Sequence, residues 1–230
     1  MIYDFIIQNR EILKIFYGLM VVLICLVIVL RTDRLFRISL HQGIRYFRNA
    51  FFFFSLAFLI RYIMGSNVLV PIIHNNYFFI VKVAFEFFLI MAGFFLLYSL
   101  LWKKIEVSGE SYPSSLFNPV ILIFYLFTFS VIFLDLIWNT YSFMFVSQII
   151  LFSFASAISF VNYENNSRRH KFLKFYFIAM IFSLIAWVLN ALAALLFNWN
   201  PLFAINISII NLIIFLIFLL GVINVTKYRG

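Results

Sequence analysis

Charged residues are scarce in this chain. Only 11% of its 230 residues are Asp, Glu, Lys or Arg, whereas a soluble domain keeps about a quarter of its residues charged. Hydrophobic residues make up 66% of the chain, 34 residues are Phe, and the mean hydropathy is +1.09. A water-soluble body of this size cannot bury so much apolar surface. We therefore expect an all-α integral membrane protein that uses the bilayer as its solvent.

Residues that carry chemistry are also few. The chain has one cysteine, Cys25, which lies in an apolar run, so an intrachain disulfide and a cysteine-based metal site are both excluded. The three histidines, His41, His74 and His170, lie near predicted connections and do not form an HExxH motif. No glycine-rich phosphate loop and no Ser/His/Asp arrangement is recognisable. We expect no catalytic residues, no bound metal and no cofactor, and the chain is not predicted to be an enzyme.

Long apolar runs dominate what is present. A helix that crosses a bilayer needs about 20 mostly apolar residues, and polar or turn-forming residues separate such runs here. The sequence predicts one domain over residues 1–230, built as a bundle of seven transmembrane helices. The predicted spans are 12–30, 46–65, 77–101, 116–138, 141–162, 172–197 and 201–225.

The distribution of basic residues predicts the orientation. Thirteen of the 17 Lys and Arg residues fall in alternate connections or in the tail, on one side of the predicted bundle. The other side holds only Arg10 and Lys14. Because Lys and Arg collect on the cytoplasmic side, we expect the N-terminus outside, the C-terminus in the cytoplasm, and a multi-pass protein of the cell membrane. The net charge of +9 then reflects topology and does not indicate nucleic-acid binding.

The first predicted connection, residues 31–48, mixes five arginines with apolar residues. Ordinary topological charge is the simplest explanation of this pattern. The basic connections are also candidates for contact with anionic lipid headgroups or with a cytoplasmic protein partner.

Strongly polar residues inside the spans are the candidate functional residues, because polar groups in hydrocarbon are costly unless they are paired or face a cavity. All of them fall in the half of the predicted bundle nearer the outside. The predicted ligand-binding residues are Arg61, Lys82, Glu86, Asp135, Gln148, Asn190 and Asn206.

Helical periodicity indicates which faces point inward. Lys82, Glu86 and Gly93 lie within about 40° of one another on the third span. Arg61, Gln148 and Asn190 each share a face with small residues, as expected of a bundle interior. In the last span, Asn206 and Asn211 are about 140° apart, so both cannot point toward one centre.

Two interpretations of this cluster stay open. In one, Arg61, Lys82 and Glu86 form the centre of an outward-facing site for a small ligand or ion, and Lys82 and Glu86, four positions apart, form an ion pair. In the other, the charges only fasten neighbouring spans together, since an unpaired charge in lipid costs about 2.5–3.5 kcal/mol.

Functional expectations follow from this outward bias. A retinal protein is excluded because the last span contains no lysine. We expect a receptor-like or sensory module with an outward-facing polar pocket that signals through a cytoplasmic partner. The alternatives are a small-solute or proton-coupled transporter, which would use the intramembrane charges, and a non-catalytic assembly subunit.

Overall fold

The computed structural model describes residues 10–64, 76–105, 116, 118–166, 171–196 and 201–227. Within these ranges the chain is helical apart from short turns and contains no strand. Seven of the helices are long and apolar enough to cross a membrane. The predicted all-helical architecture with seven membrane-spanning lengths is therefore confirmed for the described part of the chain.

The helix bounds follow the predicted spans closely. A short π-helical segment, η1, continues the second predicted span beyond α3. The elements are α2 (Arg10–Ser39), α3 (Gln42–Phe58), η1 (Leu59–Met64), α4 (Asn76–Ile105), α5 (Pro119–Ile137), α6 (Ser142–Asn166), α7 (Lys171–Leu195) and α8 (Pro201–Lys227).

The largest difference from prediction is at the first connection. Only Leu40 and His41 separate α2 from α3, so most of the arginine-rich stretch is helical and not a loop. Ionic contacts hold the hairpin together: Asp33 pairs with Arg37 on its own helix and with Arg48 on α3. Apolar length sets how much of a helix a bilayer covers, but it does not set where the helix ends.

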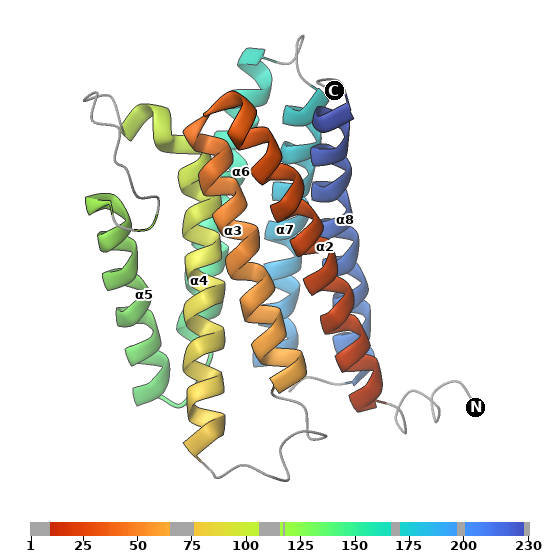
Figure 1. Cartoon of the computed structure of the whole chain (residues 1–230). Helices are drawn as coiled ribbons and strands as arrows, with labels where there is room; N and C mark the ends of the chain where they lie inside the picture. The colour runs from red at the N-terminus through yellow and green to blue at the C-terminus, as the bar shows by residue number, and fades with distance from the viewer. Residues whose placement is uncertain are drawn as a thin grey trace.

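Six of the helices form a closed ring through their pairwise contacts, and Figure 1 shows them from the side. Going round it, α2 packs against α3, α3 against α4, α4 against α6, α6 against α7, α7 against α8, and α8 against α2. The interior is rich in aromatic side chains, including the buried Phe51, Phe54 and Phe95 of the α3–α4 pair. Many apolar side chains on the outer surface are exposed, as expected of a protein whose solvent is lipid.

Helix α5 stands outside this ring and packs on α4 and α6 (Figure 1, left). Of its 19 residues only Ile121, Thr128, Ile132 and Asp135 are buried. Its start is well defined: Asn118 caps it by accepting a hydrogen bond from the Val120 N–H at 3.1 Å, and Pro119 follows at the first helical position, where its missing N–H costs nothing.

The two ends of the bundle differ in charge. The basic end holds the α2–α3 turn, the start of α5, the end of α6, the start of α7 and the end of α8. The opposite end holds the start of α2, the end of η1, the α5–α6 turn and the start of α8. Neither end is thereby assigned to a side of the membrane.

Candidate functional site

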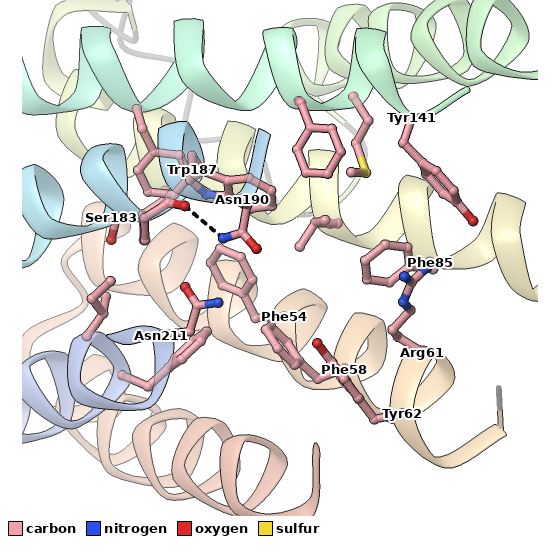
Figure 2. A pocket seen from close by; sticks show the side chains of 18 of the residues that line it. Phe54, Phe58, Arg61, Tyr62, Phe85, Tyr141, Ser183, Trp187, Asn190 and Asn211 are labelled. Atoms are coloured by element: carbon pink, nitrogen blue, oxygen red, sulfur yellow. Dashed lines mark hydrogen bonds between the residues drawn. The ribbon is translucent and has the colours of Figure 1, made fainter. Parts of the chain in front are cut away.

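A cavity of about 90 Å³ lies inside the ring of six helices (Figure 2). Nineteen described residues from α3, η1, α4, α6, α7, α8 and the α5–α6 turn line it, and ten of them are aromatic. The polar groups among them are few: Arg61, Ser183, Asn190 and Asn211 besides the tyrosines and Trp187. An apolar cavity with a small number of convergent polar groups is the usual form of a small-molecule site.

The cavity extends along the bundle axis. Phe85 and Leu96 of α4 both line it, and eleven residues at about 1.5 Å each correspond to about 16 Å. Phe85 lies toward the opposite end of the bundle, whereas Leu96 lies past the middle of α4 toward the basic end. The cavity wall therefore follows α4 over about three helical turns.

An aromatic layer closes the ring on the basic side of the cavity. Phe47 and Phe51 of α3, Tyr176 of α7 and Phe218 of α8 are all buried, and neighbouring rings lie 4.8–5.9 Å apart from centroid to centroid. The Tyr176 hydroxyl is also within 3.1 Å of Ser99 Oγ and donates to the Leu96 carbonyl at 3.3 Å. This layer is packed and hydrogen-bonded, so the cavity is blind toward the basic end.

Arg61 lies in the π-helical segment η1, and its neighbour Tyr62 also lines the cavity. The Arg61 guanidinium is 4.9 Å from the Phe85 ring centroid and 5.6 Å from that of Tyr141 (Figure 2). π-helical turns are rare and occur often at functional sites. Arg61 therefore points inward, as predicted, but its guanidinium contacts aromatic rings and not an acidic side chain.

The predicted Lys82–Glu86 ion pair is not formed. Lys82 Nζ donates to the carbonyl of Thr140 at 3.1 Å and lies 4.6 Å from the Tyr141 ring centroid. Glu86 is fully buried, and neither of its carboxyl oxygens has a hydrogen-bond partner. The lysine side chain is long and flexible, so its ammonium can reach other acceptors. A spacing of four residues therefore places the two charged side chains on one face of the helix, but it does not ensure that they form an ion pair. Neither residue lines the cavity among its described walls.

Asp135 has a structural position that the sequence interpretation missed. It is fully buried at the end of α5, and its carboxylate accepts hydrogen bonds from Phe143 N at 3.0 Å, Met144 N at 2.7 Å and Thr140 Oγ1 at 3.1 Å. The first two donors are N–H groups of the first turn of α6, which no carbonyl within the helix can satisfy. Asp135 therefore joins α5 to α6 and lies outside the described cavity wall.

Gln148 on α6 is buried against α4. Its Nε2 donates to the Leu89 carbonyl at 3.2 Å, while Oε1 has no partner. A Cβ added to Gly93 would lie 2.9 Å from this Oε1, so the glycine makes room for the amide. The predicted role of Gly93 in close helix packing is confirmed, and Gln148 belongs to the α4–α6 contact.

The two amides that line the cavity come from α7 and α8. Asn190 donates through Nδ2 to the Ala186 carbonyl at 2.8 Å, and Asn211 lies across from it (Figure 2). Asn206, the predicted residue of the last span, is exposed on the outer surface and lines no described part of the cavity. The correction follows from the separation of the two asparagines around α8: when Asn211 points inward, Asn206 must point away.

The structure thus places Arg61 and Asn190 on the cavity, keeps Lys82 and Glu86 beside it, and assigns Asp135 and Gln148 to helix contacts. The aromatic walls, Asn211 and Ser183 were absent from the predicted site, because an aromatic residue in a chain with 34 Phe carries no signal by itself.

Comparison of the chain with protein-family models, curated proteins and solved structures gave no match.

Proposed function

We propose that this chain is a receptor-like membrane protein that binds a small solute in its ring cavity, with its opposite end facing the outside of the cell and its basic end in the cytoplasm. The observation that carries the proposal is the cavity itself, an apolar space with a few convergent polar groups that an aromatic layer separates from the basic end. A transporter in one state of alternating access is also closed on one side, so the side from which the cavity is reached decides between the two functions.

The basic end supplies a surface for a cytoplasmic partner in this proposal. Arg37 is highly exposed there, and Arg45 and Arg48 both lie over the ring of Phe36, with 5.9 and 5.8 Å from guanidinium carbon to ring centroid. Helices α3, α7 and α8 each contribute both to the cavity wall and to the aromatic layer. A ligand that shifts these helices would therefore move the layer and the basic end together.

Cysteine labelling tests the cavity. In a Cys25→Ala background, Asn190→Cys should react with a small, membrane-impermeant methanethiosulfonate sulfonate, because the proposed binding site must be open to water. Val188→Cys, two residues away on the same helix and 38% exposed on the outer surface, should stay unlabelled in the bilayer. Equal labelling of both positions, or of neither, would contradict an aqueous cavity.

The side of entry separates a sensor from a transporter. The same reagent is added to sealed right-side-out vesicles and to sealed inside-out vesicles. If the protein is a sensor, Asn190→Cys should react only when the reagent is on the extracellular side. Labelling from both sides would favour the transporter, since alternating access exposes one site to each compartment in turn.

A further inference from the structure

The charge balance of the cavity wall indicates the class of ligand, and this inference rests on the ligand-binding function proposed above. Among the nineteen described residues that line the cavity, Arg61 is the one with a charged side chain. The other polar groups are neutral amides, hydroxyls and an indole. A ligand that enters the cavity therefore meets one positive charge and no negative one on its described wall.

The protein leaves the Arg61 donors available. A guanidinium carries five N–H donors, but in the described ranges Arg61 makes neither a hydrogen bond nor an ion pair, and its contacts are the faces of Phe85 and Tyr141. Stacking on aromatic faces holds a guanidinium in place and keeps its N–H edge free for a planar acceptor. A carboxylate matches that edge with two parallel hydrogen bonds.

The nearby acidic residues do not cancel this positive charge through direct contact. Asp135 is occupied by the first turn of α6. Glu86 is near enough to interact electrostatically with Arg61 and Lys82, yet its oxygens accept no hydrogen bond. The Lys82 ammonium lies over the same Tyr141 ring as Arg61, so both cations at this end of the bundle contact an aromatic face and neither is in direct contact with an acidic side chain of the described residues.

The remaining wall is suited to an apolar, flat body. Phe54, Phe58, Phe145, Trp187 and Phe215 surround the space beyond Arg61. Aromatic rings prefer edge-to-face or offset contact with other rings, which an aromatic ligand provides. The amides of Asn190 and Asn211, farther along the cavity (Figure 2), are suited to a second, neutral polar substituent.

We propose that the ligand is a small organic monoanion with a flat apolar body, an aromatic carboxylate, whose carboxylate binds Arg61 and whose ring lies among the aromatic side chains of the cavity. Arg61 is then the residue that selects anions over neutral and cationic molecules of the same shape.

Three probes of nearly the same shape test this class: radiolabelled benzoate, with unlabelled benzamide and benzylamine as competitors, on the full-length protein in nanodiscs. We expect benzoate to bind saturably and benzamide to compete at least tenfold less well. Benzylamine should not compete. Equal competition by benzamide, or stronger competition by benzylamine, would overturn the anion class on the wild-type protein alone.

Variants assign the selectivity to Arg61. Arg61→Gln should lower benzoate affinity at least tenfold, and Arg61→Lys should restore part of it, because lysine keeps the charge but loses the two-pronged geometry. Ser130→Ala, on the exposed face of α5, should bind benzoate as the wild type does. Benzoate affinity unchanged in Arg61→Gln would overturn the assignment.

The two proposals fail in different ways. If Asn190→Cys is labelled but none of the three probes binds, the cavity function stands and the aromatic-anion class is wrong. If Asn190→Cys is not labelled at all, the ligand-binding function itself is wrong.

Discussion

Two acidic residues, Asp135 and Glu86, are both fully buried in this protein, yet their surroundings are opposite. Asp135 accepts three hydrogen bonds, two of them from the backbone at the start of α6. Glu86 accepts none. Hydrogen bonds to a charged group contribute about 1.5–3 kcal/mol each, whereas removal of a group without partners forfeits no such bond. Residue type and depth alone therefore say little about what a buried acid does for stability.

This contrast predicts different costs for the same chemical change. Asp135→Asn should lower the free energy of unfolding by about 1–3 kcal/mol, because the neutral amide oxygen is a weaker acceptor for the α6 N–H groups. Glu86→Gln should change it by less than about 1 kcal/mol. Unfolding of both purified variants in mixed micelles of a mild detergent and dodecyl sulfate measures the difference. A loss at Glu86 as large as at Asp135 would restore the interpretation in which Glu86 fastens the helices together.

At the scale of single elements, the contact between α4 and α6 depends on one glycine. Gly93 faces Gln148 and Leu151, and an added Cβ would lie 2.9 Å from Gln148 Oε1 and 3.2 Å from Leu151 Cδ1. The helices approach closely there because nothing projects from α4 at that position. Two other glycines have the same function elsewhere: Gly18 against Tyr62 and Gly43 against Trp102.

Gly93→Ala should therefore destabilise the protein by up to about 2 kcal/mol. Overpacking of about 1–3 kcal/mol is offset in part by the better helix propensity of alanine, about 1 kcal/mol. The double variant Gly93→Ala with Gln148→Ala should lose less than the sum of the two single variants, because the neighbour that clashes has been removed. Strictly additive losses in the same unfolding assay would contradict this account of the α4–α6 contact.

The sequence was informative about elements and faces, and less so about pairing. The lengths of the apolar runs were sufficient to predict all seven helices. The small residues that share a helix face with Arg61 and Asn190 correctly predicted that both side chains point inward. Sequence could not choose between Asn206 and Asn211, because α8 is apolar on every side and offers no polar face to orient it. The hydrogen bonds of Asp135 could not be predicted for a different reason. Its partners are backbone N–H groups, which every residue has, so no sequence pattern marks them.

At the scale of the whole molecule, a six-helix ring encloses the cavity and α5 lies outside it. The basic residues gather at one end, where Asp33 ties α2 to α3, and the cavity lies nearer the other end. This separation of a ligand cavity from a charged surface is what a signalling module requires. It also makes the orientation in the membrane the property on which the proposed direction of signalling depends.

A pair of cysteine variants tests that orientation. Ile38→Cys at the basic end and Trp138→Cys at the opposite end, 65% and 58% exposed in the native side chains, are compared in the Cys25→Ala background on intact cells. The positive-inside rule predicts that a membrane-impermeant maleimide labels Trp138→Cys from outside, and Ile38→Cys only after permeabilisation. Labelling in the reverse pattern would invert the proposed topology and place the cavity entrance in the cytoplasm.

Closure of the ring through α2 and α8 has a consequence for the order in which the protein is made. Membrane helices insert first and associate afterwards, and synthesis proceeds from the N-terminal side at about 5–20 residues per second. Helix α2 must therefore wait in the bilayer for about 10–40 s before its second neighbour is synthesised. Asn211 arrives with that neighbour, so the last wall of the cavity is also the last to be translated. Until then the half-built ring is open to lipid.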